Sequence, residues 1–179
     1  MVDEAIVAAA AAAVDAGEVL EYARSLIAAK SENPGGSEDE AAGVASEILT
    51  DAGSVPEVVR SPAGRPSVVA TIGDGDGPSL AWNGHLDVVP AGSPDTWSHD
   101  PWAGEVDAGG RLVGRGAADM KGPIAAALRR SGTPIRGSLV FHLAADEELA
   151  GVHGTKVLWE RDLLTQDAAI VGEPSELQI

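Results

Sequence analysis

Four short segments of this chain carry carboxylates or a histidine directly after an expected strand or hairpin. They are His85-Leu86-Asp87, Asp119, Asp146-Glu147-Glu148 and Glu173. Oxygen donors combined with one imidazole form a ligand set that suits a divalent metal ion. Open α/β sheets bind their ligands beyond the carboxyl ends of the strands. Four segments that are far apart in the sequence can therefore converge on one metal site.

The first two segments each allow a structural and a functional interpretation. The carboxylate of Asp87 can orient the imidazole of His85 toward a metal, although a strand-end histidine followed by a capping Asp is the commoner arrangement. Asp119 lies among glycines in GRGAADMKG, residues 114–122, where backbone can approach a ligand and a carboxylate can bridge two cations. It can equally cap a helix that begins near Pro123. The local sequence leaves these alternatives open.

The last two segments also allow a structural and a functional interpretation, and for Glu173 taken alone the structural one is the commoner. Asp146-Glu147-Glu148 directly follows the apolar run LVFHLAA. Three acids in an acidic chain usually form a solvated loop, but the exit of a buried strand favours metal binding. Adjacent glutamates can then divide the work, one binding metal and the other acting as general base toward a metal-bound water. Glu173, in VGEPS, fits a ligand at a rigid turn or a simple turn.

Two helices are expected at the N-terminal end. Residues 4–30 are rich in Ala and predict one long helix. Ser37 and Glu40 predict a capping box for a second helix, which ends at Gly53. The expected buried stripe of the first helix consists of Ile6, Val7, Val14, Val19, Leu20, Leu26 and Ile27.

Extended and helical patterns alternate along the rest of the chain. They predict strands at 55–60, 67–72, 79–83, 138–145 and 168–171, a hairpin around 108–110, helices at 123–130 and 154–161, and the start of a strand at 177–179. Such alternation predicts an α/β fold with a mixed, mostly parallel sheet and helices on both faces. No linker divides the chain, so we expect one domain over residues 1–179.

Composition excludes several classes of function. The formal net charge is −16, from 28 acidic and 12 basic residues, which disfavours binding to nucleic acid or to an anionic membrane. The chain has no cysteine, so disulfides, thiolate zinc sites and cysteine nucleophiles are excluded. An acidic, lysine-poor surface is typical of proteins kept soluble by charge, including those of high-salt proteomes. The apolar run at 5–14 is too short to span a bilayer and is flanked by acids, so a cytoplasmic protein is expected.

Taken together, GHLDVVP (84–90), GRGAADMKG (114–122), ADEELAG (145–151) and VGEP (171–174) are far more specific than any one of them. In this order and spacing the chain resembles the co-catalytic zinc amidohydrolases and peptidases that include acetylornithine deacetylase, succinyl-diaminopimelate desuccinylase, aminoacylase and glutamate carboxypeptidase. The likeness extends over nearly the whole chain. It implies a zinc-peptidase-like catalytic domain and a two-metal zinc site, with Co or Mn as substitutes.

The resemblance also implies a role for each site residue. His85 and Glu173 would bind the first zinc, Asp119 would bridge both zincs, and Glu148 would bind the second. Asp87 would orient His85. Glu147 would be the general base for attack of a zinc-bridging hydroxide on the amide, and the Asp119–Met120 peptide bond is expected to be cis. These assignments use six residues of this sequence, namely His85, Asp87, Asp119, Glu147, Glu148 and Glu173.

The family pattern continues beyond the point that matches Ile179. It includes a further zinc-binding His and an inserted dimerisation domain that lends a His to the substrate oxyanion. We therefore expect residues 1–179 to be a single incomplete catalytic domain, without the inserted domain. We also expect self-association as a homo-oligomer, or a complementing C-terminal chain.

The expected function is metal-dependent hydrolysis of a linear amide bond in a small N-acyl amino acid or peptide, of the deacetylase or desuccinylase type used in amino-acid biosynthesis. The alternative is a truncated, catalytically impaired fragment that binds metal or needs a partner chain for activity.

Overall fold

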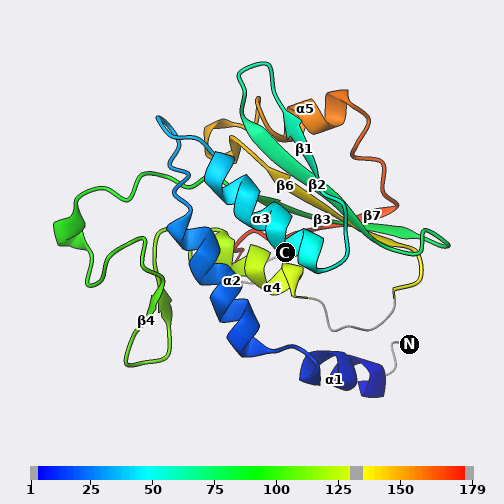
Figure 1. Ribbon diagram of the computed structural model, residues 1–179, viewed down its shortest axis with the longest axis horizontal. Coiled ribbons are helices and arrows are strands. Elements are labelled where there is room, and N and C mark those ends of the chain that lie inside the picture. Colours follow the sequence, from blue (N-terminus) through cyan, green and yellow to red (C-terminus); the bar gives the residue numbers. More distant parts are fainter. Residues whose placement is uncertain (1–3, 130–134, 176–179) are drawn as a thin grey trace.

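The computed structural model describes residues 4–129 and 135–175. Its centre is a five-stranded sheet in the order β1-β2-β6-β3-β7 (Figure 1). The strands are β1 (Glu57–Arg60), β2 (Pro66–Gly73), β3 (Ser79–His85), β6 (Ser138–Ala144) and β7 (Ala168–Val171). β2 is antiparallel to β1 and to β6, whereas β3 is parallel to β6 and to β7. Only β2 therefore runs against the other four, and the mixed, mostly parallel sheet is confirmed.

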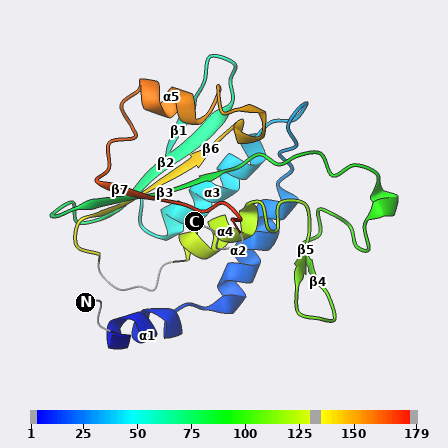
Figure 2. The same ribbon diagram turned by 180° about the vertical axis from the view of Figure 1, so that it is seen from behind.

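Helices lie on both faces of the sheet, as predicted (Figures 1 and 2). One face is covered by α2 (Ala16–Ala28), α3 (Asp39–Asp51) and α4 (Lys121–Leu128), and α5 (Thr155–Glu160) lies on the other. Successive side chains along a strand point to opposite faces of the sheet, so the sheet separates two hydrophobic cores. Leu143 and Phe141 face the larger cluster, which includes Leu26, Leu49 and Ile124. Val59, Val157 and Leu158 form the smaller cluster beneath α5.

The N-terminal region differs from the sequence prediction. In place of one helix over 4–30 the chain forms α1 (Glu4–Ala12) and α2, because the side chain of Asp15 caps α2 by accepting the N–H of Gly17 at 2.7 Å. Within the expected stripe, Leu26 and Ile27 of α2 are fully buried, while Val7 and Val14 are exposed. Alanine-rich composition predicted helix correctly, but it concealed the cap that divides it.

The second predicted helix is present, but its start differs in detail. The hydroxyl of Ser37 accepts the N–H of Asp39 at 3.1 Å, and Glu38 occupies the N-cap position without a side-chain capping bond. The capping box between Ser37 and Glu40 was therefore wrong. Gly53 follows α3 with φ +85°, the left-handed conformation that ends many helices.

The remaining elements agree with their predictions to within a few residues. The hairpin consists of β4 (Glu105–Val106) and β5 (Leu112–Val113), which pair antiparallel and extend away from the sheet (Figure 2). Short 3₁₀ turns are η1 (Pro94–Thr96) and η2 (Glu147–Leu149). The strand start expected at 177–179 lies outside the described residues. No helix in the described ranges is long and apolar enough to cross a membrane.

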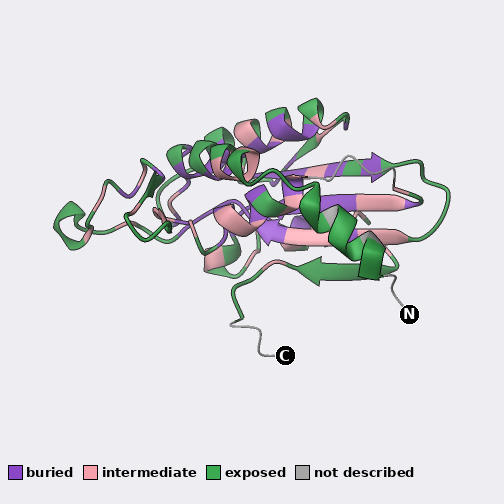
Figure 3. Ribbon diagram, turned by 90° about the horizontal axis from the view of Figure 1, so that it is seen from below, coloured by how far each residue is buried: buried purple, intermediate pink, exposed green. Residues whose placement is uncertain are grey.

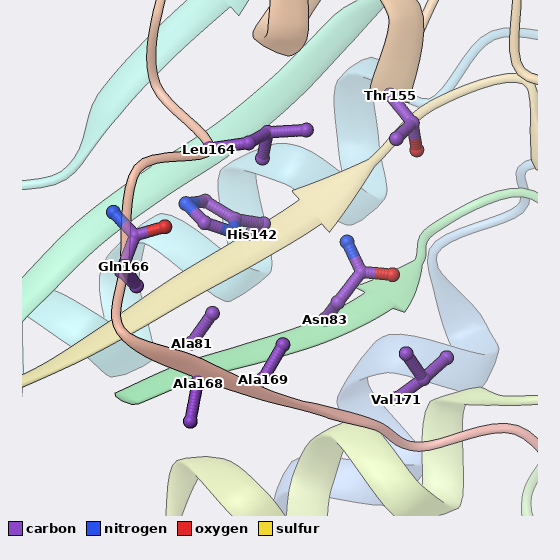
Figure 4. A pocket seen from close by; sticks show the side chains of 9 residues that line it. All are labelled: Ala81, Asn83, His142, Thr155, Leu164, Gln166, Ala168, Ala169 and Val171. Atoms are coloured by element: carbon purple, nitrogen blue, oxygen red, sulfur yellow. The ribbon is translucent and has the colours of Figure 1, made fainter. Parts of the chain in front are cut away.

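The face of the sheet that carries α5 is only partly covered. β7 is exposed along its whole length, as the lowest strand in Figure 3 shows. Between β7 and α5 lies a hollow of about 240 Å³ (Figure 4), lined mainly by small and apolar side chains, with His142 at its base. Neither His85 nor any of the site carboxylates of Asp119, Glu147, Glu148 and Glu173 is among the residues that line it.

Candidate metal centre

His85 is the last residue of β3 and lies at the centre of the candidate site. It is 1% exposed, and its ring Nδ1 is 2.8 Å from the carbonyl oxygen of Asp87. A carbonyl oxygen only accepts hydrogen bonds, so Nδ1 carries the hydrogen. In the neutral imidazole the lone pair then belongs to Nε2, which faces the carboxylates of three other segments. The backbone thus prepares the ring to act as a ligand through Nε2.

Carboxylates from three segments surround Nε2 of His85. The nearest oxygens are Oδ1 of Asp119 at 2.9 Å, Oε1 of Glu173 at 3.4 Å and Oε2 of Glu147 at 3.9 Å. Two overlapping sets have potential ligand atoms all within 4.8 Å of one another: His85, Glu147 and Glu173, and His85, Asp119 and Glu148. The predicted site residues therefore do meet at the carboxyl edge of β6, β3 and β7.

Asp119 is positioned by its neighbour Met120, and the peptide bond between them is cis, as the resemblance implied. The side chain of Met120 is fully buried, and its sulfur lies 3.3 Å from the backbone nitrogen of His85. It packs where Gly84 and Gly172 leave room, because a Cβ at either glycine would come within 2.8 Å of the Met120 methyl group. Asp119 is not the cap of α4, since Met120 occupies the N-cap position.

The acidic turn after β6 is held against Asp87. Asp146 adopts the left-handed conformation with φ 60°, which turns the chain into η2. The carboxylate of Asp87 then accepts the backbone N–H of Glu147 at 3.0 Å and that of Glu148 at 3.1 Å. The side chain of Glu148 in turn accepts the N–H of Val89 at 3.2 Å. Asp87 therefore fixes the backbone from which both glutamates project.

The charges in the site explain several shifted pKa values. Burial opposes protonation of His85, but Asp87 and Asp119 outweigh burial and raise its pKa to about 10. The pKa of Glu148 and that of Glu173 are raised, first by burial and then by Asp119, while His85 acts in the opposite direction. Negative charge is therefore concentrated around one imidazole, and a divalent cation would neutralise it.

The donor set fits a divalent metal. One imidazole nitrogen and carboxylate oxygens from Asp119, Glu147, Glu148 and Glu173 lie together beyond the carboxyl ends of β6, β3 and β7. Zinc accepts both kinds of ligand, and cobalt and manganese accept the same donors. Glu147 belongs to one of the two sets and Glu148 to the other.

Sequence reasoning missed three residues behind this site. Asn33, Glu38 and Arg65 contact Asp87 and Asp146 through buried or partly buried hydrogen bonds. Asn33 lies in Asn-Pro-Gly-Gly, which reads as a turn, and Glu38 and Arg65 read as ordinary surface charges. Single-sequence patterns carry no signal for such contacts between distant segments.

The fold and the ligand set are those of an α/β domain built around a cluster of potential metal ligands. A family model described as peptidase family M20/M25/M40 matches residues 81–179. Succinyl-diaminopimelate desuccinylase of Rhodopseudomonas palustris (strain BisB5) is 41% identical over 175 residues, which are 90% of this chain and 44% of that protein. The chain belongs to peptidase family M20/M25/M40.

Solved structures show the same fold. An M20 family metallo-carboxypeptidase from Sulfolobus solfataricus superposes with TM-score 0.74 at 21% identity, over 87% of this chain and 37% of that one. A Bacillus subtilis protein described as a dinuclear metal-binding peptidase of the M20 family superposes with TM-score 0.59 at 23% identity, over 87% of this chain and 42% of that one. The chain thus spans less than half the length of the relatives that it matches.

Proposed function

We propose that this chain carries the metal site of a hydrolase that cleaves an amide bond in a small N-acyl amino acid. His85, Asp119, Glu148 and Glu173 would bind one or two divalent cations, with zinc as the first choice. The observation that carries the proposal is the convergence of His85 and four carboxylates into two overlapping sets within 4.8 Å. The description of the Bacillus subtilis relative as dinuclear supports two cations.

A bound metal would polarise the amide carbonyl and lower the pKa of the attacking water. The residues of the chain contribute positioning and proton transfer. Glu147, whose side chain is 49% exposed, can reach both a water and a substrate in the open site. Its carboxylate would accept the proton of the attacking water and then donate it to the leaving amine. The hydrogen bond from His85 to the Asp87 carbonyl would keep Nε2 available throughout.

An N-succinyl amino acid is the substrate class that we favour. Sequence similarity supports it, because the 41% identical relative is a succinyl-diaminopimelate desuccinylase. N-acetylornithine is the comparison substrate.

A second candidate function is metal binding without hydrolysis by this chain alone, with activity only in the presence of another polypeptide. The exposure of β7, which includes Ile170 at 51% and Val171 at 59%, favours it. This candidate predicts tight zinc binding without turnover by residues 1–179.

The test combines metal content with turnover. Zinc stoichiometry would be measured on the purified chain, and hydrolysis of N-succinyl-diaminopimelate and N-acetylornithine would be followed as release of the free amine. One or two tightly bound zinc ions with faster succinyl hydrolysis are expected. Bound zinc with no turnover would favour the second candidate, and no binding at micromolar zinc would refute the site.

A further inference from the structure

We propose that Asn33 and Arg65 are positioning residues, which hold the turn that carries Glu147 and Glu148 at the metal site. This inference rests on the proposed function of that site. Neither residue touches a potential ligand atom. Both act through Asp87 and Asp146, the two acids that fix the backbone of the turn.

The position of Asn33 follows from pairing beside the end of β3. The N–H of Asn33 donates to the carbonyl of Val88 at 2.8 Å, and the N–H of Val88 donates to the carbonyl of Ser31 at 3.0 Å. The hydroxyl of Ser31 donates to the carbonyl of Leu86 at 2.6 Å. This short parallel bridge places the side chain of Asn33 directly beside Asp87.

The amide group of Asn33 joins two acids that come from different strands. Its Nδ2 donates to Oδ2 of Asp87 at 2.8 Å and to Oδ1 of Asp146 at 3.2 Å. Asn33 is 2% exposed, Asp87 is fully buried and Asp146 is 3% exposed. Buried carboxylates this close together repel one another unless donors lie between them. Asn33 supplies both of its amide hydrogens at that point.

Asn33, Glu38, Arg65, Asp87 and Asp146 form one hydrogen-bonded network, and Arg65 supplies its positive charge. Its guanidinium forms a two-pronged contact with the fully buried carboxylate of Glu38, with Nε 2.6 Å from Oε2. Its NH1 group lies 3.5 Å from Oδ1 of Asp146 and 3.4 Å from the amide oxygen of Asn33. Glu38 also accepts the backbone N–H of Asp146 at 3.1 Å. Arg65 therefore orients Asn33 and compensates the charge of the acids behind the turn.

These contacts give the network an effect at the metal site. Asp87 bonds to the amides of Glu147 and Glu148 with its carboxylate and to the ring of His85 with its carbonyl. Removal of Asn33 takes away the donor that Asp87 and Asp146 share, and removal of Arg65 takes away a donor to Asp146 and to the amide oxygen of Asn33, so the turn is free to shift. Partners beyond the direct ligands typically alter metal affinity 10–100-fold, and roughly that loss is expected here.

The variants separate positioning from a general loss of stability. Asn33→Asp keeps the shape but replaces two donors by an acceptor that faces Asp87 and Asp146. Arg65→Met removes the charge, and Arg65→Lys restores charge without the planar fork. Val157→Ala is the matched control, because it weakens the separate cluster beneath α5 without touching the network.

Two measurements on the full chain test the proposal. Hydrogen exchange of the Glu147, Glu148 and His153 amides, which donate to Asp87 and Asp146, is measured without metal against the amides of β6. The visible absorption spectrum and affinity of bound Co²⁺ are measured next. Asn33→Asp and Arg65→Met should speed exchange in the turn selectively, change the spectrum and weaken binding roughly 10–100-fold. Arg65→Lys should recover part of each effect.

Other results would overturn the inference. If exchange rises equally in the turn and in β6, as expected for Val157→Ala, the network only stabilises the fold. The same conclusion follows if the variants bind Co²⁺ with unchanged affinity and spectrum. The exchange measurement uses the metal-free chain. It therefore shows whether Asn33 and Arg65 position the turn even if the parent chain binds no metal and the proposed function fails.

Discussion

Nδ1 of His85 donates to the main-chain carbonyl of Asp87 at 2.8 Å, whereas the carboxylate oxygen of Asp87 lies 3.6 Å from the same nitrogen. The family resemblance implied that Asp87 orients His85, and a side-chain contact is the obvious means. The structure uses the backbone of Asp87 for the ring and its side chain for the turn that carries Glu147 and Glu148. One residue thus holds two parts of the site through different atoms.

Asp87→Asn should therefore spare the imidazole and disturb the turn. The carbonyl of residue 87 remains, so Nδ1 of His85 keeps its acceptor. The new amide NH₂ would face the donors of Asn33, Glu147 or Glu148, and a buried unpaired donor costs about 1–3 kcal/mol. Unfolding in denaturant should show that loss, while ¹⁵N NMR of the zinc-loaded protein, in which the ring is neutral, should still find its proton on Nδ1. A changed tautomer would mean that the carboxylate orients the ring.

Glu147→Ala should keep metal binding and remove any amide hydrolysis, because this carboxylate is proposed to transfer the proton. Glu148→Ala, its matched neighbour, should weaken zinc binding. Calorimetric titration with zinc and amine-release assays on both variants distinguish the two roles. Loss of zinc from Glu147→Ala, with retention by Glu148→Ala, would mean that the two glutamates exchange functions.

Gly172→Ala should destabilise the chain by crowding the residues beneath the site. The added methyl would lie about 2.5 Å from the Trp82 ring and 2.8 Å from the Met120 methyl group. Overpacking of this kind costs about 1–3 kcal/mol. Gly43→Ala, in α3 with nothing within 4 Å, is the control and should raise the free energy of unfolding by roughly 1 kcal/mol. Equal effects of the two changes would contradict the packing described.

His142 should make the chain less stable below neutral pH. Burial lowers its pKa from 6.5, with a bond to the backbone of Leu163 acting in the opposite direction. The unfolded chain therefore takes up this proton first, and stability falls as the pH drops below about 6.5, by at most about 1.4 kcal/mol per pH unit.

His142→Leu should remove that pH dependence, and the hollow beside His142 leaves room for the side chain. His85 acts with the opposite sign, because its contribution is fully present below about 6.5 and is lost as the pH rises through about 10. This contribution of His85 is the same in the parent and in the variant, so it cancels when their stabilities are compared. Melting temperatures of both metal-free proteins between pH 5.5 and 7.5 provide the check. Parallel curves would show that His142 is not titrating.

Most strands of the sheet could be predicted because the run of apolar residues that marks each strand is continuous in the sequence. Apolar runs such as 138–144 identified the strands, and the four motifs indicated which residues would meet. The break at Asp15 was missed because alanine favours helix on both sides of it. The network of Asn33, Glu38 and Arg65 could not be predicted, since its partners lie 27 to 113 residues apart along the chain.

Among the described residues, β7 is attached to the sheet along one edge, by parallel pairing with β3, and both of its faces are exposed. Glu173 lies two residues beyond its end. On the proposed ligand set, a metal held by both His85 and Glu173 would fasten this strand to its neighbour. Part of the binding free energy would then serve as folding free energy. A chelator would accordingly release β7 from β3 first, because the exposed faces of this strand add little hydrophobic packing to hold it.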